Sequence, residues 1–394
     1  MKYYIISGEA SGDLHGSNLI KQLHLLDKTA NIRCWGGDLM EQAGAYLVKH
    51  YRELAFMGFS EVIKNLPTIL QNIKFCKKDI LLSQPDVLIL IDYPGFNLRI
   101  AEWAKENGLR IVYYISPQVW AWKENRVKKM KKCIDKMLCI LPFEKDYYKN
   151  KWNWKVEYVG HPLVEVIEEK QSGVRNLESG VFVNSKQENS NSLLLTKDSK
   201  SLTPNSRLIA LLPGSRKQEI AKKLPIMLEV AKSFSEYQFV VAEAPGLDAS
   251  FYQPFLTAYQ NVSTVRNQTY DLLMNACAAL VTSGTATLET ALFGVPEIVC
   301  YKGSEISYQI AKRLIKIKYI SLVNLIMNKP VVTELIQDQL TSENLVKELS
   351  ALLNNADRKA ILKKDYFELK AILSAGGHAS AQAAKSIVQY VSTN

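Results

Sequence analysis

Three glycines spaced four residues apart, at positions 8, 12 and 16, follow a short apolar run near the start of the chain. Glu9, Asp13 and His15 stand between them. The spacing matches neither the dinucleotide fingerprint nor a phosphate loop ending in Gly-Lys-Ser/Thr, and two carboxylates would repel a phosphate. We therefore predict a strand-to-helix turn that binds a ligand rich in hydroxyl groups. The alternative is an ordinary tight turn with a solvated Glu and Asp.

One aspartate, Asp92, stands at the end of the apolar run 87–91 and precedes a Pro-Gly turn. The carboxyl end of a buried parallel strand faces the ligand crevice in α/β proteins. Partial burial would raise the pKa of this carboxyl group and suit it to act as a base. The alternative is that Asp92 caps the helix that we expect to begin near Asn97.

The stretch LLPGSRKQEI, residues 211–220, predicts a second ligand-binding turn. A strand ends, Pro213 and Gly214 form a turn, and Ser215 is expected to cap a helix that begins near Arg216. Helix N-termini bind phosphate through free backbone N–H groups, and an arginine fork suits a diphosphate. The alternative is a capped helix with an exposed arginine.

Two further stretches have polar residues at places where a nucleotide could bind. In residues 282–296 a strand leads through a glycine turn into a helix, and Glu289 inside that helix could accept both hydroxyls of a ribose or be an exposed helix residue. In residues 319–338, Asn324 and Gln337 are uncharged polar groups in an apolar stretch, which is usually a structural feature.

Together these features indicate an enzyme that acts on a sugar nucleotide. The C-terminal half has two expected helix N-termini, an arginine and a glutamate, which suit a nucleotide diphosphate. The N-terminal half has the carboxylates, which suit hydroxyls and base chemistry. The sequence has no Asp-x-Asp motif and no paired-histidine spacing, so we predict no metal. Protein cations and helix dipoles would then stabilise the diphosphate leaving group.

Alternating strand and helix patterns must position these residues. Apolar runs bounded by turn residues alternate with helical patterns such as 97–107, which predicts parallel βαβ units. A polar segment rich in Ser and Asn, 171–206, lacks clear periodicity and is interpreted as a linker or surface insertion. The expected strands are 3–6, 87–91, 111–115, 137–140, 156–159, 208–212, 238–242, 278–281 and 297–300.

Composition limits the remaining classes of protein. At 394 residues the chain is long for one core, so two domains are expected. No apolar run approaches the ~18 residues of a membrane span, and the N-terminus does not read as a signal peptide. The six cysteines have no C-x-x-C spacing and are expected to be reduced thiols. The net charge of +10 favours anionic partners, and residues 123–151 hold ten Lys and Arg against four acids.

Nine motifs in order resemble those of the lipid-A-disaccharide synthase family (glycosyltransferase family 19), over nearly the whole chain. The motifs are SGEASGDLHG, MGFSEV, IDYPGFN, SPQVWAWKENRVKKM, LPFEKDYY, VGHPL, LLPGSRKQEI, SGTATLE and YISLVNLI. The resemblance implies an α/β protein of the GT-B fold, in which two Rossmann-like domains with parallel sheets face a central cleft. Segment 171–206 is longer and more polar than the domain connection usual in this family.

The implied reaction is metal-independent, needs no cofactor and inverts the anomeric centre. It joins UDP-2,3-diacylglucosamine to 2,3-diacylglucosamine 1-phosphate (lipid X), giving the β-1′,6-linked disaccharide 1-phosphate and UDP. The implied domains are an acceptor-side domain, 1–168, a linker, 169–206, a UDP-sugar domain, 207–365, and a helical segment, 366–394, that packs back on the first domain.

The resemblance also places family residues on Asp92, Arg216, Glu289 and Asn324, and it assigns no individual roles to Glu9, Asp13 and His15. The catalytic base falls on Asp92. The acceptor or reacting-centre residues are Glu9, Ser11, Asp13, His15 and Asn97. The nucleotide-sugar residues are Gly214, Ser215, Arg216, Ser283, Gly284, Thr285, Glu289, Asn324 and Gln337.

Two rival functions stay open. One is a sugar-nucleotide epimerase of the same fold, and the other is a non-enzymatic basic protein that binds anionic lipid through residues 123–151. No nucleic-acid partner is expected, and a homodimer stays possible. The implied location is the cytoplasm, peripheral on the inner membrane.

An apolar stripe at helical spacing in residues 59–73 could meet the membrane or an acyl chain of a substrate. We expect two short helical pieces, because Pro67 interrupts the stripe. The alternative is that the stripe faces the protein core. The residues expected to be exposed are Val62, Ile63, Leu66, Ile69 and Leu70.

Overall fold

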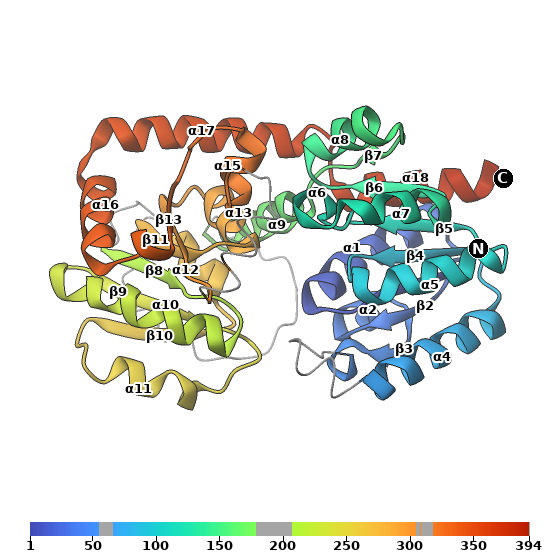
Figure 1. Cartoon of the computed structure of the whole chain (residues 1–394), viewed down its shortest axis with the longest axis horizontal. Helices are drawn as coiled ribbons and strands as arrows, with labels where there is room; N and C mark the ends of the chain where they lie inside the picture. Colours follow the sequence, from blue (N-terminus) through green and yellow to red (C-terminus); the bar gives the residue numbers. More distant parts are fainter. Residues whose placement is uncertain (55–65, 179–206, 305–307, 309–317, 394) are drawn as a thin grey trace. The chain divides into compact units, whose positions relative to one another are not determined.

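The computed structural model describes residues 1–54, 66–178, 207–304, 308 and 318–393 (Figure 1). The chain forms two compact units. Unit 1 comprises Met1–Glu165 and Ile372–Asn394, and unit 2 comprises Val166–Ala371. Each unit contains one parallel sheet covered by helices.

Unit 1 is built on a seven-stranded sheet with the order β3-β2-β1-β4-β5-β6-β7, in which every pair is parallel. The central strand β4 is buried along its whole length, as its unbroken Val, Leu and Ile sequence requires in a sheet covered on both faces. The strands are β1 (Lys2–Ser7), β2 (Asn31–Gly36), β3 (Tyr46–His50), β4 (Val87–Ile91), β5 (Ile111–Tyr114), β6 (Lys136–Cys139) and β7 (Glu157–Tyr158).

Helices cover both faces of this sheet and bury two apolar clusters. One cluster lies under α4, α5 and α7, and the other lies under α1 and α18. The C-terminal helix α18 packs directly against α1 through small residues such as Ala383 and Ala384 (Figure 1). The helices are α1 (Ala10–Leu26), α2 (Asp38–Gln42), α4 (Leu66–Ser83), α5 (Pro94–Glu106), α6 (Val119–Trp122), α7 (Val127–Cys133), α8 (Pro142–Trp152) and α18 (Ala379–Thr393).

Unit 2 is built on a six-stranded parallel sheet with the order β10-β9-β8-β11-β12-β13. The strands are β8 (Leu208–Leu212), β9 (Gln238–Glu243), β10 (Val262–Arg266), β11 (Ala278–Thr282), β12 (Glu297–Tyr301) and β13 (Thr333–Ile336). The helices are α10 (Lys217–Glu229), α11 (Gln253–Leu256), α12 (Thr269–Asn275), α13 (Thr285–Leu292), α15 (Leu322–Met327) and α16 (Ser342–Asn354).

Two helices run across the division between the units in the sequence, α9 (Pro162–Glu178) and α17 (Ala356–Ser374). Within unit 1, the Glu165 carboxylate accepts a hydrogen bond from the Ser380 hydroxyl, which ties the start of α9 to α18. Short 3-10 turns complete the fold at Tyr51–Glu53, Glu124–Arg126, Val230–Ser233, Ala249–Phe251 and Gln337–Gln339.

The sequence missed four strands, which are β2, β3, β10 and β13. Three of them, β3, β10 and β13, include partly exposed positions, so their apolar residues do not form an unbroken run. The linker interpretation was wrong over 171–178, because α9 continues to Glu178. Residues 179–206 lie outside the described part of the chain.

The apolar stripe was expected to be exposed, and the structure contradicts this for part of it. Ile73 is 9% exposed, and Ile69 packs against the core of unit 1. Leu70 is 54% exposed, as expected. Ile69 and Ile73 are four residues apart, so they share the side of α4 that packs on the core, whereas Leu70 lies on another side. Val62, Ile63 and the side chain of Leu66 lie outside the described residues.

Candidate active site

Asp92 lies at the carboxyl end of β4, on a backbone that is held in an uncommon conformation. Its φ is +43°, and that of Tyr93 is +49°. Non-glycine residues adopt this left-handed region only at a cost, which the surrounding contacts must offset. The Asp92 carbonyl accepts hydrogen bonds from the Asn97 amide (2.8 Å) and the Tyr113 hydroxyl (2.5 Å).

The side-chain amide of Asn97 holds this turn through hydrogen bonds to backbone carbonyls. Its side chain is fully buried, and its amide nitrogen lies 3.4 Å from the Ile6 carbonyl and 3.2 Å from the Ile91 carbonyl. One amide therefore ties the ends of β1 and β4 to the backbone of Asp92. Asn97 positions the turn and does not present its amide nitrogen to a ligand.

The Asp92 carboxyl group has the electrostatics of a base. Burial and the nearby negative charge of Glu9 raise its pKa to about 6. No described side chain donates a hydrogen bond to it. The helix cap proposed as its alternative role is wrong, because the N-cap residue of α5 is Tyr93. The carboxyl group is therefore free to accept a proton.

A close contact brings Glu9 to this position. A Cβ on Gly8 would lie 2.3 Å from the ring of Tyr93, so only glycine fits beneath that ring. Glu9 follows at once as the N-cap residue of α1, exposed and without a capping hydrogen bond from its side chain. Burial and the negative charge of Glu9 also raise the pKa of the Tyr93 hydroxyl.

Asp13 is used by the protein itself. Its buried carboxylate accepts hydrogen bonds from the backbone N–H groups of Gly37 (2.8 Å), Leu39 (3.2 Å) and Met40 (3.0 Å). It thus caps the first turn of α2 from another helix. The sequence predicted that Asp13 would meet a ligand. In the structure its carboxylate is bonded to these backbone N–H groups instead.

The other polar residues of α1 differ in exposure. Ser11 is exposed. His15 is partly buried, and its Nδ1 has no hydrogen-bond partner among the described residues. Burial lowers the pKa of His15 to about 4, and burial with the nearby His15 lowers that of His161 to about 3. Both imidazoles are therefore neutral at neutral pH.

In unit 2, the turn after β8 has the geometry of an anion site. Gly214 has φ +121°, which favours glycine, and α10 begins at Lys217. Ser215 does not cap this helix as expected, because the N-cap residue is Arg216 and no side chain caps it. The first N–H groups of α10 are thus free of a side-chain cap. The Arg216 side chain is 64% exposed, with Glu219 3.9 Å away.

Lys223 joins this turn, and the sequence reasoning missed it. Its residue is 2% exposed, and burial lowers the pKa of its ammonium group. The ammonium nitrogen lies 3.6 Å from the place that a Cβ on Gly214 would occupy, and a Glu219 oxygen lies 3.1 Å from it. Glu219 and Lys223 are four residues apart, so both lie on the side of α10 that faces the turn. This spacing is the feature of the sequence that could have identified Lys223.

The turn after β11 repeats the same plan. Gly284 has φ +151° and is the N-cap residue of α13, which begins at Thr285. The Ser283 hydroxyl donates to the Ile320 carbonyl (2.9 Å). Glu289 is partly buried and accepts a hydrogen bond from the Tyr270 hydroxyl (3.0 Å). Burial raises the pKa of Glu289, so the alternative of an exposed helix residue is wrong.

Asn324 and Gln337 bind the chain itself. The Asn324 amide donates to the Val332 carbonyl and the Glu334 carboxylate, at 2.9 Å each, and its oxygen accepts from the Val332 N–H. Both of its N–H groups are therefore used. The Gln337 side-chain oxygen accepts from the Gly303 N–H (2.6 Å). These amides hold loops next to β13 and do not point freely at a nucleotide.

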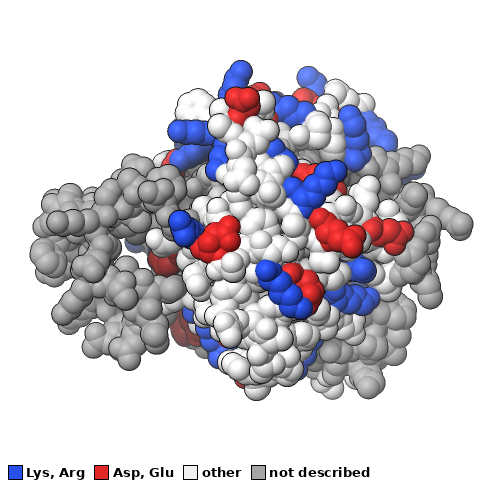
Figure 2. All heavy atoms as spheres, turned by 90° about the vertical axis from the view of Figure 1, so that its left-hand side faces the viewer, with Lys and Arg blue, Asp and Glu red and all other residues white. Residues whose placement is uncertain are grey.

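Three of the ten cations in the basic segment 123–151 pair with neighbouring acids. Lys129 pairs with Glu102 (2.7 Å), Lys151 with Glu124 (2.5 Å) and Lys136 with Glu157 (3.0 Å). In Figure 2, which views another face of the molecule, acidic and basic side chains are likewise interspersed. Such pairs are typical of a solvated surface.

The described residues show neither a membrane-spanning helix nor a cluster of metal ligands. None of their helices is both long and apolar enough to cross a membrane. No group of three or more His, Cys, Asp or Glu side chains among them is arranged to hold a metal ion. Five of the six cysteines are buried, and all six are free thiols, as expected from their spacing.

Sequence comparisons give one family over nearly the whole chain. The family model described as Lipid-A-disaccharide synthetase matches residues 3–391. The Lipid-A-disaccharide synthase of Syntrophus aciditrophicus is 37% identical over 391 residues, with 97% of this chain and 96% of that protein covered. The enzyme of the same name from Trichlorobacter lovleyi is 35% identical over 382 residues, with 95% and 93% covered.

Structure comparisons concern the fold. The UDP-GlcNAc 2-epimerase from Neisseria meningitidis bound to UDP-GlcNAc has a TM-score of 0.65 at 14% identity, with 100% of both chains covered. The glycosyltransferase of kitacinnamycin has a TM-score of 0.65 at 12% identity, with 98% of both covered. Such low identity speaks for the architecture alone. The predicted GT-B fold with two Rossmann-like domains is confirmed.

Proposed function

The chain belongs to the lipid-A-disaccharide synthase family, and from that premise we propose how its residues divide the work of the reaction. It is a glycosyltransferase of lipid A biosynthesis. The substrates are UDP-2,3-diacylglucosamine and 2,3-diacylglucosamine 1-phosphate, and the products are the β-1′,6-linked disaccharide 1-phosphate and UDP. The observation that carries this assignment is the match of both curated relatives across more than nine-tenths of their length.

Asp92 acts as the general base. Its carboxylate accepts the proton of the acceptor 6-hydroxyl while that oxygen attacks the anomeric carbon of the donor. The bond from the anomeric carbon to the UDP oxygen breaks on the opposite face, so the anomeric centre inverts. Support comes from the pKa of about 6, which keeps the group ionised at neutral pH and more basic than an ordinary aspartate. The rigid turn fixes the direction of the carboxyl group.

UDP binds to the two glycine turns of unit 2. The N–H groups that open α10 and α13, together with Arg216, bind the diphosphate and stabilise its charge as it leaves. Lys223 adds a second cation beside Gly214. Glu289 accepts hydrogen bonds from the ribose hydroxyls. Asn324 and Gln337 act by holding the neighbouring loops, since their amides are bonded to the chain.

The turn that opens unit 1 serves the acceptor. Glu9 is exposed and close enough to Asp92 to raise its pKa, so it can bind a sugar hydroxyl beside the reacting centre. Asp13 holds the start of α2, and Asn97 holds the turn that carries Asp92, each through contacts to the backbone. His15 supplies a neutral imidazole with a free ring nitrogen.

We also propose that the enzyme works at the cytoplasmic face of the inner membrane. Leu70 and Phe75 on α4 are 54% and 46% exposed, and Lys74 and Lys78 beside them are exposed cations. Apolar and basic side chains on one helix suit an anionic lipid surface. Leu70→Ser should weaken binding to vesicles of anionic phospholipid and leave the melting temperature unchanged. Ile73→Ser, a buried change on the same helix, should lower the melting temperature instead.

Incubation with both lipid substrates tests the assignment directly. The disaccharide 1-phosphate and UDP should appear in equal amounts. An epimerase would release UDP or an epimerised sugar without joining two sugars, and a lipid-binding protein would leave both substrates unchanged. Either of those results would refute the assignment. The family match disfavours both alternatives.

A further inference from the structure

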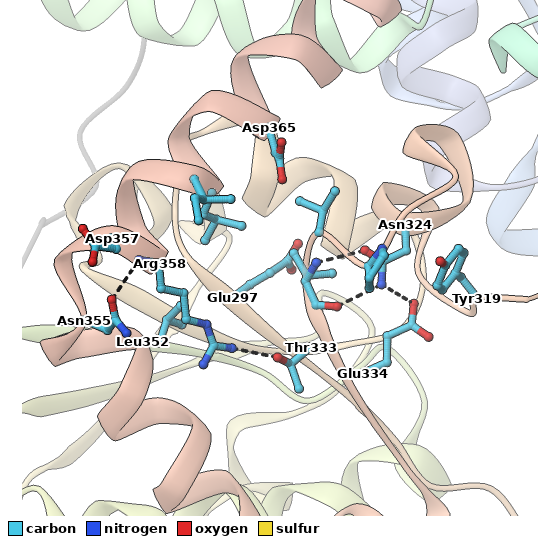
Figure 3. Close-up of a pocket in the computed structure, with 15 residues that line it drawn as sticks. Glu297, Tyr319, Asn324, Thr333, Glu334, Leu352, Asn355, Asp357, Arg358 and Asp365 are labelled. Carbon is cyan, nitrogen blue, oxygen red and sulfur yellow. Dashed lines mark hydrogen bonds between the residues drawn. The ribbon is translucent and has the colours of Figure 1, made fainter.

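A second pocket in unit 2 lies away from the glycine turns. It has a volume of about 550 Å³ and is bordered by the first residues of β12 and β13, the end of α16 and the start of α17 (Figure 3). Glu297 and Thr333 open their strands, so the pocket is at the amino ends of the strands. The turns with Gly214 and Gly284 follow the carboxyl ends of β8 and β11. The pocket therefore lies at the opposite strand ends from these turns, and Asn324 of α15 is one of its lining residues.

Glu297 is an unpaired buried carboxyl group in the wall of this pocket. The residue is 1% exposed, and neither carboxyl oxygen has a hydrogen-bond partner among the described residues. Burying such a group without a partner costs free energy. Figure 3 shows its side chain in the middle of the pocket, with Asp365 pointing toward it from α17. A ligand with a hydrogen-bond donor would satisfy it.

Carboxyl groups outnumber cations in the lining of the pocket. Asp357, Asp365 and Glu334 line it together with Glu297, and Arg358 is the lining cation among the described residues. The Arg358 guanidinium group is bonded to Glu348 (3.0 Å) and to the Thr333 hydroxyl (2.7 Å), which neutralises it. Asp365 shares Lys329 with Glu368. The acids thus exceed the cations.

The remaining lining is apolar. Leu352 and Leu362 are buried, and Val331 and Val332 close the side toward β13. Methylene groups would pack on these side chains, and a cationic end would meet the carboxyl groups. Volume, charge and lining therefore agree on a short aliphatic chain that ends in an ammonium group.

We propose that this pocket binds a small aliphatic amine, with its ammonium group hydrogen-bonded to Glu297 and its methylene groups against Leu352 and Leu362. The pocket is at the amino ends of the strands and the glycine turns are at the carboxyl ends, so the amine would bind at a different place from the diphosphate. Nothing in this proposal depends on the identity of the sugar substrates.

Binding should release a proton. Burial raises the pKa of Glu297 well above its usual range, which favours the protonated carboxyl group in the empty pocket. The titratable groups that face it are Tyr366, Cys300, Glu334 and Asp365. An arriving ammonium ion favours the carboxylate and expels the proton. Affinity should therefore increase from pH 6 to pH 8, and the heat of binding should depend on the buffer.

Calorimetry with 1,4-diaminobutane as the probe tests the site on the full-length protein. The native protein should bind it saturably at pH 8, and the neutral 1,4-butanediol should not bind. Glu297→Gln keeps the shape of the side chain and should weaken diamine binding by about tenfold or more, since a charge-assisted contact is lost. Glu343→Gln, an exposed change of the same charge on α16, is the matched control and should bind as the native protein does.

UDP affinity should be unchanged in both variants, which separates this site from the proposed transferase site. If Glu297→Gln does not fold, Asp365→Asn replaces it, again with weaker diamine binding expected. The proposal is overturned if the native protein shows no saturable binding, if the diol binds equally well, or if the Glu297 variant binds the diamine with native affinity.

Discussion

The carboxyl-end edges of the two sheets have the same topology and opposite chemistry. In unit 1 the edge carries carboxyl groups, with Asp92 on a strained turn and Glu9 beside it. In unit 2 the edge carries hydrogen-bond donors and cations. These are the N–H groups in the first turns of α10 and α13, and the side chains of Arg216 and Lys223. A parallel sheet thus supplies a place for a ligand, and the residues after each strand decide its charge.

The two edges also differ in how they hold their key groups. The backbone carbonyl of Asp92 accepts two partly buried hydrogen bonds, from Asn97 and Tyr113. The Arg216 side chain is 64% exposed, and its ion-pair neighbour among the described residues is Glu219, 3.9 Å away. A base must be aimed at one hydroxyl, whereas a cation attracts a diphosphate over a broader range of positions. We expect substitutions on the first edge to cost more activity than those on the second.

The largest effect is expected for Asp92→Asn. Turnover should fall by ~10²–10⁴, the usual contribution of a general base. Stability should rise by up to about 2 kcal/mol at pH 7, because a buried charge with a pKa of about 6 is removed and asparagine tolerates positive φ. Steady-state assays and thermal melts measure both. Full activity in this variant would remove Asp92 from the mechanism.

Stability and reaction rate should depend on pH in opposite directions at Asp92. Since the native pKa of about 6 exceeds the ordinary value of 3.8, the native state holds this proton more tightly than the unfolded chain. The contribution of Asp92 to stability is therefore present below about pH 4 and is lost as the pH rises to about 6. The rate should increase across pH 6 as the base ionises. A rate profile that is flat from pH 5 to pH 7 would contradict the assignment.

Asp13→Ala should cost stability more than chemistry. Three backbone N–H groups lose a charged acceptor, and we expect a loss of about 1–3 kcal/mol in the free energy of unfolding. Urea denaturation measures this value. The turnover of the protein that remains folded should stay within a few-fold of the native rate. A loss of turnover without a loss of stability would indicate that Asp13 contacts the substrate.

The smallest of these effects is expected for Arg216→Ala. UDP affinity should fall by about tenfold, because a bidentate contact to phosphate is removed, while the exposed side chain adds little to stability. Titration with UDP and a melting curve separate the two. Lys232→Ala, an exposed lysine elsewhere in unit 2, serves as the control for net charge. Native UDP affinity in the Arg216 variant would show that the N–H groups of α10 act without it.

The sequence by itself determined the class of the fold and the ends of the central strands. Strands such as β4 and β8 are continuous apolar runs with a Pro-Gly pair shortly after each, so local pattern alone located both edges. The order of nine motifs gave the family. Asp92, Arg216 and Glu289 became candidates because residue type and position after a strand or a glycine turn can be read locally from the sequence.

Only the tertiary structure decided which polar side chains are free. Asp13 and Asn324 look like ligand-binding groups in the sequence, yet each meets backbone groups that lie elsewhere in the chain. Lys223 and Glu297 look like ordinary charged residues, yet packing buries both. Hydrogen bonds and desolvation depend on neighbours distant in sequence, so the partners of a polar group, and with them its pKa and its availability, are set by the fold.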